Sequence, residues 1–348
     1  TSSNGFDARS NYRIMNPLLA ILHAPVSALI SVGLFIRHRL YDAHILHSSS
    51  VSVPTVCVGN LALGGTGKTP HTEYLIRQLS SRYKLAVLSR GYGRRTKGFR
   101  MVTPTDTALT VGDEPLQIAT KFPSIPVAVC EKRVVGVRKL IKLYPDLQLV
   151  ILDDAFQHRA IRCDLNILLT AHDNLYVHDH VWPLGRLRDL KMRSHKAQVI
   201  IVTKCPEGIK PIEKRIIETS LHKLSFQQLY FSSYTYAPLP QEGTPLVVTG
   251  IANPQPFFDY VQQLCPKAEL LSFPDHHLFL SFEVDKIVSK AKGFDYVLTT
   301  EKDLPRLVAA GVQEALGNRL YTLPIEVSIL NEGDQLIKKI SNTIDKLC

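Results

Sequence analysis

Paired cysteines and recognised nucleic-acid-binding signatures are absent from this chain of 348 residues. The six cysteines are scattered without a C-x-x-C pair, which argues against a zinc site or a disulfide framework and favours a reducing, cytoplasmic compartment. No zinc-finger, RNA-binding or helix-turn-helix signature occurs, and aromatic residues are not interleaved with basic clusters. We therefore expect no nucleic-acid partner.

Acidic residues are outnumbered by basic ones, 31 against 41, and no internal repeat or low-complexity segment is visible. This balance favours an anionic partner, which leaves acidic lipid headgroups or a phosphorylated substrate once nucleic acid is set aside. The length is sufficient for two domains with cores of their own.

Charged residues are also missing between Ile14 and Ile36, a stretch long enough to span a bilayer. Prolines within it argue against one continuous helix, so we expect two short helices, the second over residues 26–36. Arginines directly after it would meet anionic headgroups. We predict that residues 1–45 form a membrane-associating helical segment lying in the interface. The alternative is a pair of core helices packed on the first domain.

A glycine-rich turn follows the β-rich apolar run at residues 53–58 and ends in Lys68 and Thr69, where a helical pattern begins. In such a turn backbone N–H groups converge on a phosphate, the lysine reaches the β and γ phosphates, and the threonine hydroxyl can bind Mg²⁺. The strict pattern G-x-x-x-x-G-K-[ST] has glycine where this chain has Ala62, and the extra glycine stands at Gly59. A turn that only caps a helix would not need the Lys-Thr pair. The predicted nucleotide-binding residues are Gly64, Gly65, Thr66, Gly67, Lys68 and Thr69.

A second apolar run, residues 147–152, ends in Asp153 and Asp154. Uninterrupted apolar residues followed by acid are typical of a parallel strand that is buried on both faces and opens at its carboxyl edge. Without a phosphate-binding loop, paired aspartates more often form a solvated turn or helix cap. Here we predict that Thr69, Asp153 and Asp154 hold Mg²⁺.

Further apolar runs alternate with helical patterns and predict an α/β fold: a P-loop NTPase-like α/β/α sandwich over residues 46–225. A smaller α/β domain is expected at 237–318. Strands at about 226–236 and 319–330 would join the two as a two-stranded linker, and a C-terminal helix at about 331–348 would return to the first domain. Two such strands would act as a hinge around a substrate cleft.

Several motifs together carry a family resemblance: G-N-x-x-x-G-G-T-G-K-T-P, S-R-G-Y-G-R, G-D-E-P, D-D-x-F-Q-H, P-x-G-x-L-R-[ED], F-x-D-H and T-E-K-D. Their order resembles the tetraacyldisaccharide 4'-kinases, the lipid A 4'-kinases of Gram-negative bacteria, from the N-terminal segment to Asp303. Ala155 and Asp189 are small departures from that pattern. The resemblance implies an enzyme on the cytoplasmic face of the bacterial inner membrane. It would use ATP and Mg²⁺ to phosphorylate the 4'-hydroxyl of a tetraacylated diglucosamine 1-phosphate, with no obligate protein partner.

The resemblance also implies residue roles. Asp113 of G-D-E-P and His276 of F-x-D-H would act as a pair that handles the proton of the acceptor hydroxyl. We expect them on different domains, so that closure assembles the site. Arg133 and Arg188 would face phosphates. The second-tier candidates are Glu114, His158, Arg188 and Asp189.

Each of these residues also has a structural interpretation. Asp113 and Glu114 could cap the following helix, His276 could belong to a surface or packing pair, and the arginines could be ordinary surface charges. Two further segments have no assigned role and fit helix-start chemistry: Thr203-Lys204 and Thr300–Asp303.

Two other functions stay open. One is a membrane-associated switch ATPase or GTPase. Leu63 occupies the place where switch ATPases often carry a second lysine, and T-K-C-P at 203–206 lacks the aspartate of the guanine signature N-K-x-D. The other is a soluble small-metabolite kinase, against which the apolar N-terminus and the basic charge argue.

Overall fold

The computed structural model describes residues 17–275 and 277–347, and the chain divides into two compact units. The first unit comprises residues up to Leu88, Lys132–Ser233 and the chain from Ser328. The second comprises Ser89–Glu131 and Tyr234–Val327.

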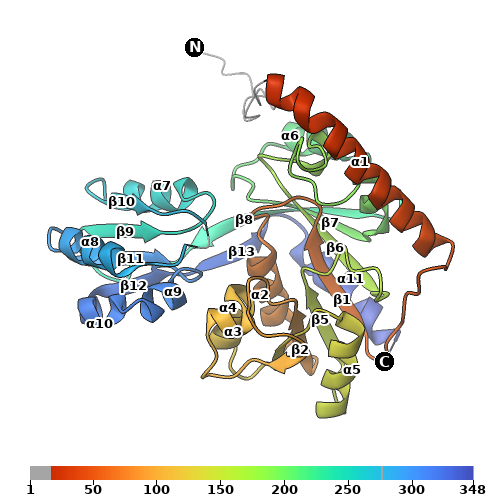
Figure 1. Cartoon of the computed structure of the whole chain (residues 1–348), viewed down its shortest axis with the longest axis horizontal. Coiled ribbons are helices and arrows are strands. Elements are labelled where there is room, and N and C mark those ends of the chain that lie inside the picture. The colour runs from red at the N-terminus through yellow and green to blue at the C-terminus, as the bar shows by residue number, and fades with distance from the viewer. Residues whose placement is uncertain (1–16, 276, 348) are drawn as a thin grey trace. The chain divides into compact units, whose positions relative to one another are not determined.

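The first unit is built on a sheet whose strands run in the order β13-β8-β7-β6-β1-β5-β2 (Figure 1). Their bounds are β1 Thr55–Asn60, β2 Leu85–Ser89, β5 Leu149–Asp153, β6 Leu165–Ala171, β7 Val199–Thr203, β8 Gln228–Tyr236 and β13 Ile325–Ile329. Neighbours from β2 to β8 pair in parallel. Every residue of β1, β2, β5 and β7 is buried, which explains their uninterrupted apolar sequences. The predicted parallel sheet is confirmed.

Helices accompany these strands. They are α1 Pro17–Asp42, α2 Lys68–Leu79, α5 Arg133–Leu143, α6 Pro211–Leu221 and α11 Gly333–Asp345, with short 3-10 helices η1 Tyr176–His178 and η2 Lys191–Lys196. The C-terminal helix α11 belongs to the first unit, as expected. Because β1 lies between β5 and β6, its carboxyl end opens at the centre of the sheet.

The second unit contains a four-stranded parallel sheet in the order β10-β9-β11-β12. Its elements are β9 Pro245–Thr249, α7 Gln255–Leu264, β10 Glu269–Ser272, α8 Ser281–Ala291, β11 Tyr296–Thr300, α9 Leu304–Ala309, α10 Val312–Leu316, η3 Gly317–Arg319 and β12 Leu320–Leu323. Along β9, Leu246 and Val248 join one apolar cluster while Val247 joins another. Successive strand residues point to opposite faces, so both faces of this sheet are covered.

The sequence placed residues 89–131 with the first domain, whereas the contacts group this segment with the second unit. It contains β3 Arg100–Met101, which pairs antiparallel with β4 Val127–Val129, and helices α3 Ala108–Val111 and α4 Asp113–Lys121. Lys121 Nζ lies 2.7 Å from Glu301 Oε1, an ion pair between residues 180 positions apart. Local alternation of strands and helices does not reveal such a pairing.

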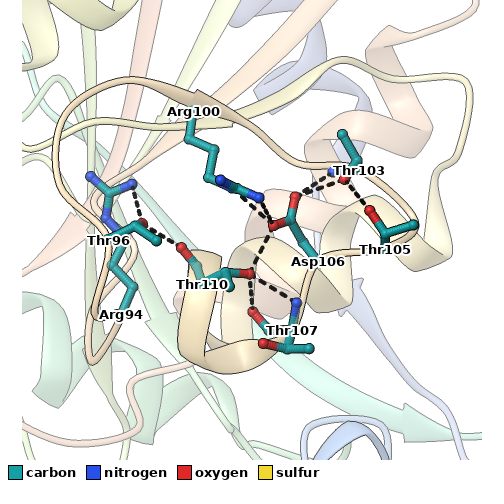
Figure 2. A network of polar contacts seen from close by, with 8 residues as sticks. All are labelled: Arg94, Thr96, Arg100, Thr103, Thr105, Asp106, Thr107 and Thr110. Atoms are coloured by element: carbon teal, nitrogen blue, oxygen red, sulfur yellow. Dashed lines mark hydrogen bonds and ion pairs between the residues drawn. The ribbon is translucent and has the colours of Figure 1, made fainter.

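Polar side chains hold the chain between β3 and α3 (Figure 2). Asp106, whose side chain is buried, accepts hydrogen bonds from Arg100 Nε at 2.9 Å, from the backbone N–H of Thr103 at 2.9 Å and from Thr110 Oγ1 at 2.8 Å. Burial opposes ionisation of this carboxyl, but the hydrogen bonds from Arg100 and the threonines outweigh it and lower the pKa of Asp106 to about 2. The loop that leads into α4 is therefore ordered by a charged centre.

The N-terminal prediction of two short helices is wrong: α1 is one helix of 26 residues with Pro25 inside it. A proline there removes one backbone hydrogen bond and crowds the preceding turn, and the remaining bonds of a long helix tolerate this local cost. Within the described part of the chain, Leu19–Asp42 is apolar and long enough to cross a bilayer by length and composition. However, Ser27 Oγ donates to Val181 O at 2.6 Å, so the helix contacts the first unit at mid-length.

Candidate active site

The phosphate-binding loop is formed by the seven residues between β1 and α2 and by the first residues of α2. Gly64 and Gly67 have φ values of 100° and 86°, in the left-handed region that favours glycine, and Lys68 and Thr69 begin α2. The first backbone N–H groups of a helix have no intrahelical partner and are available to an anion. The structure thus brings together all six predicted nucleotide-binding residues.

Asn60, at the end of β1, organises the loop. Its Nδ2 donates to Thr66 Oγ1 at 2.6 Å, and its Oδ1 accepts from Arg188 Nη2 at 2.5 Å. Its carbonyl oxygen accepts from Gln157 Nε2 at 2.6 Å. This asparagine stands in the motif G-N-x-x-x-G-G, but the phosphate-binding pattern G-x-x-x-x-G-K-[ST] assigns it no role.

The backbone beside the loop comes from the P-x-G-x-L-R-[ED] motif. Leu63 N donates to Arg186 O at 2.7 Å, and Arg188 N donates to Leu61 O at 2.8 Å. This short pairing fixes Arg188 next to the phosphate cradle. A glycine is required at position 59 for steric reasons. A Cβ there would lie 2.6 Å from Phe156 Cβ, so the displaced glycine lets the D-D-A-F-Q-H turn approach β1 closely.

The acidic pair after β5 lies at this loop, but its two members have different surroundings. Arg188 Nη1 lies 3.0 Å from Asp154 Oδ2, and Arg188 Nη2 contacts the other carboxylate oxygen. Lys68 Nζ is 4.0 Å from Asp154 Oδ1. Burial opposes ionisation of Asp154, but the charges of Lys68, Arg188 and Arg133 outweigh it and lower its pKa. Asp154 therefore carries a negative charge that already has cationic partners.

Asp153 fits a Mg²⁺ ligand better. It is buried at the end of β5, pairs in register with Val58 of β1, and accepts a hydrogen bond from Thr72 Oγ1 at 3.4 Å. Thr69 lies three residues before Thr72 on α2, hence on the same helix face. Among the described residues no group of three or more His, Cys, Asp or Glu could hold a metal. Mg²⁺ in phosphoryl-transfer sites needs only one or two carboxylates besides phosphates and water, so Thr69 and Asp153 fit it.

Arg133 begins α5 and is almost completely buried, with Nη2 3.3 Å from Asp154 O. It therefore adds to the positive charge around the acidic pair, as expected for a phosphate-facing arginine.

Asp113 lies in the second unit together with Asp275 and His277, so the prediction that it belongs to the first domain is wrong. It is the first residue of α4, and Gly112 before it has a φ of 94°. A Cβ at Gly112 would lie 2.9 Å from Tyr92 O, so the G-D-E-P and S-R-G-Y-G-R loops pack backbone against backbone. Arg306 Nε lies 3.9 Å from Asp113 Oδ2. His276 lies outside the described residues, while its neighbour His277 bonds Glu283 Oε2 through Nε2 at 2.8 Å.

The T-E-K-D motif, to which the sequence assigns no role, contacts Asp275 of the F-x-D-H motif. Asp303 Oδ2 accepts from Thr300 Oγ1 at 2.8 Å and from Gly250 N at 2.9 Å. Lys302 Nζ donates to Asp275 Oδ1 at 2.9 Å. The motif therefore links the carboxyl ends of β9 and β11 to the F-x-D-H loop.

All residues of the quoted motifs except His276 lie in the described part of the chain. A family model described as tetraacyldisaccharide-1-P 4'-kinase matches residues 19–345. The chain belongs to this family.

Similar proteins agree with this assignment. The tetraacyldisaccharide 4'-kinase of Bacteroides thetaiotaomicron is 42% identical over 345 residues, which cover 91% of each chain. That of Flavobacterium johnsoniae is 39% identical over 330 residues, 91% of this chain and 94% of the relative. The crystal structure of LpxK from Aquifex aeolicus in complex with ATP matches with a TM-score of 0.73 and 25% identity, over 94% of this chain and 99% of that one. The resemblance drawn from the motifs is confirmed, and the chain is a kinase.

Three remaining candidates of the family pattern lie at different places. Glu114 is the second residue of α4 and is half-buried. His158 follows the D-D-A-F-Q turn, where its N–H donates to Ala155 O at 2.8 Å. Asp189 is fully buried and bonds His38 Nε2 of α1 through Oδ1 at 2.5 Å. Asp189 thus connects the N-terminal helix to the chain directly after Arg188.

Proposed function

We propose that this kinase transfers the γ-phosphoryl group of ATP to the 4'-hydroxyl of tetraacyldisaccharide 1-phosphate in lipid A biosynthesis. The observation that carries the proposal is the arrangement of Lys68, Thr69, Asp153 and Arg188 around one phosphate-binding loop, in a chain of the tetraacyldisaccharide-1-P 4'-kinase family. A switch ATPase would need the loop but not the Asp113 and His276 motifs.

In this proposal cationic side chains neutralise the transferring phosphoryl group. Lys68 lies within 4.0 Å of Asp154, whose carboxylate also holds Arg188, so both cations are oriented before the nucleotide binds. Preorganised charge of this kind is the main contribution an enzyme makes to phosphoryl transfer. Mg²⁺ bound by Thr69 and Asp153 would supply further charge neutralisation at the β and γ phosphates.

The acceptor hydroxyl requires a proton acceptor, which we assign to Asp113 and His276 as a pair. The oxygen–phosphorus bond to the sugar forms as the bond between the γ-phosphorus and the bridging oxygen of ADP breaks. The hydroxyl proton passes to the pair. Asp113 is oriented at the start of α4 beside Arg306. His276 directly follows Asp275 in the sequence, and Asp275 accepts a hydrogen bond from Lys302 of the T-E-K-D motif.

The lipid substrate implies a membrane surface, and α1 supplies a face for it. Large apolar side chains exposed along this helix are Leu19, Ile21, Leu22, Val26, Leu29, Val32, Phe35 and Ile36. Contacts from Ser27 and His38 to the first unit favour a helix that lies in the interface with one side on the protein. We place the enzyme on the cytoplasmic face of the inner membrane, with no obligate protein partner.

The test is a transfer assay with purified protein, Mg-ATP and tetraacyldisaccharide 1-phosphate in detergent, with the lipid followed by mass spectrometry. Gain of one phosphate, abolished in Lys68→Ala and retained in Lys267→Ala at an exposed lysine of the second unit, would support the proposal. ATP consumption with unchanged lipid would instead support a switch ATPase. His276→Ala should abolish transfer while ATP binding remains, and equal loss of both would contradict the assigned role.

A further inference from the structure

Thr203 and Lys204, which the sequence analysis left without a role, meet the phosphate-binding loop. Thr203 ends β7 and is fully buried. Its Oγ1 donates to Thr66 O at 2.9 Å, with Thr170 O a second acceptor at 3.4 Å. This contact fixes the carboxyl end of β7 against the loop and determines where the next residue stands.

Lys204 adopts a backbone conformation that is unfavourable for a lysine. Its φ is 60°, in the left-handed region where glycine is favoured and a side chain is strained. Residues held in sparsely populated conformations often serve a site, because the surrounding structure must maintain the strain. This backbone conformation directs the Lys204 side chain toward the phosphate-binding loop.

The Lys204 ammonium reaches the glycines of the phosphate cradle. Its Nζ would lie 3.9 Å from a Cβ built at Gly65. Among residues 17–275 and 277–347, none forms a hydrogen bond or ion pair with this ammonium. Burial lowers the pKa of Lys204, and Asp173 only partly offsets that effect. A half-buried cation that has no hydrogen-bond or ion-pair partner among the described residues lies next to an anion-binding loop, so its charge is complementary to the ligand that the loop binds.

We propose that Lys204 is a second lysine of the nucleotide site and donates hydrogen bonds to oxygen atoms of the bound nucleoside triphosphate. The inference rests on the proposed ATP-dependent function and adds a residue that none of the phosphate-binding motifs contains. Lys68 approaches the ligand from the first turn of α2, whereas Lys204 approaches from the end of β7. Of the nucleotide's oxygens we expect those of the phosphates, because they carry the negative charge.

Three variants test this assignment. In Lys204→Met, which keeps the side-chain length but removes the charge, we expect the dissociation constant of ATP to rise at least about tenfold, as for loss of a charge-assisted hydrogen bond. Lys204→Arg should recover part of that loss. Lys204→Gly removes the charge and the backbone strain together. It should bind ATP as weakly as Lys204→Met while the ligand-free protein melts at a higher temperature.

Melting temperatures measured with and without ATP distinguish a role of Lys204 in nucleotide binding from a role in stabilising the fold. The ligand-free Lys204→Met protein should melt at or above the wild-type temperature, because the substitution removes a half-buried charge that has no ion-pair partner among the described residues. Its melting temperature should rise less on adding ATP. A lower melting temperature with unchanged ATP affinity would overturn the proposal, since it would show that Lys204 only supports the loop. Wild-type affinity in Lys204→Met would also overturn it.

Inorganic tripolyphosphate distinguishes the oxygen atoms that Lys204 contacts. Equal weakening of ATP and tripolyphosphate binding in Lys204→Met would support a phosphate contact, and weakening of ATP alone would support a contact to the nucleoside. Because these are binding measurements, they stand even if the wild-type enzyme transfers no phosphate to the lipid. A failed lipid assay would then count against the proposed function and not against Lys204.

Discussion

Arg306 Nε lies 3.9 Å from the carboxylate oxygen Oδ2 of Asp113, and both side chains are largely buried in the second unit. The same guanidinium contacts the carboxylate of Asp303 and lies 3.4 Å from the carbonyl oxygen of His277. One cation therefore joins the start of α4, the T-E-K-D motif and the F-x-D-H loop. Asp113, Asp303 and His277, which directly follows the proposed partner His276 in the sequence, thus share this arginine.

Arg306→Met should lower kcat for lipid phosphorylation by about ten- to a hundredfold, the usual effect of removing a residue that orients a reacting group. ATP affinity should stay near wild type, because the phosphate-binding loop belongs to the first unit. Arg306→Lys should restore part of the activity. Steady-state kinetics with ATP and lipid varied separately measures both constants.

Lys121→Met is the matched control, because it removes the ion pair of the same helix α4 with Glu301 but not the contact to Asp113. We expect its kcat within about threefold of wild type, because this ion pair is partly exposed and does not contact Asp113. An equal loss in both variants would assign the effect to the placement of α4 in general.

His71 predicts a pH-dependent stability. It is fully buried, with Nδ1 2.7 Å from Gly67 O and Nε2 2.9 Å from Ser232 Oγ, so neutral imidazole donates to the carbonyl and accepts from the hydroxyl. Burial lowers its pKa from 6.5 to about 4. Between these values the unfolded chain binds more protons than the folded one. The free energy of unfolding should thus fall by about 3 kcal/mol as the pH drops from 6.5 to 4 and be unaffected above.

Denaturant unfolding at several pH values measures this dependence. His71→Gln should flatten the slope between pH 6.5 and 4, whereas His47→Gln, at an exposed histidine, should leave it unchanged. If the slope survives in His71→Gln, the protons are bound elsewhere.

The two aspartates after β5 should respond differently to substitution. Asp153→Asn should raise the Mg²⁺ concentration for half-maximal activity by about tenfold or more, because it removes the metal-binding carboxylate. Asp154→Asn should mainly lower kcat, because it releases Arg188 and Lys68. Activity as a function of Mg²⁺ at saturating ATP separates the two. The reverse order of effects would reassign the ligand to Asp154.

The apolar face of α1 should bind membranes. Leu29 and Val32 are 74% and 55% exposed, and replacing both with Glu should reduce sedimentation with phosphatidylethanolamine–phosphatidylglycerol vesicles by about tenfold or more. Leu143→Glu changes a side chain on α5 that is also 55% exposed and should bind as wild type. Unchanged sedimentation of the double variant would place the membrane contact elsewhere.

Contiguous features were predictable from the sequence. The loop from Gly64 to Thr69 forms its cradle within one segment, and the acidic pair follows directly from a buried strand, so neither depends on distant residues. The predicted break of the N-terminal helix at Pro25 was wrong. The cost of a proline inside a helix is local, and the remaining backbone hydrogen bonds of a 26-residue helix outweigh it. His276 stays a prediction, since it lies outside the described residues.

The sequence by itself determined the parallel sheet, the phosphate-binding loop and the chemistry of the ligand, because strand burial and glycine-rich turns are encoded by neighbouring residues. Tertiary structure alone decided which distant side chains complete the site. Arg306 meets Asp113 across 193 positions, and Thr203 meets Thr66 across 137. Hydrogen bonds and ion pairs of this kind depend on separation in space, which strand order sets and local sequence patterns do not record.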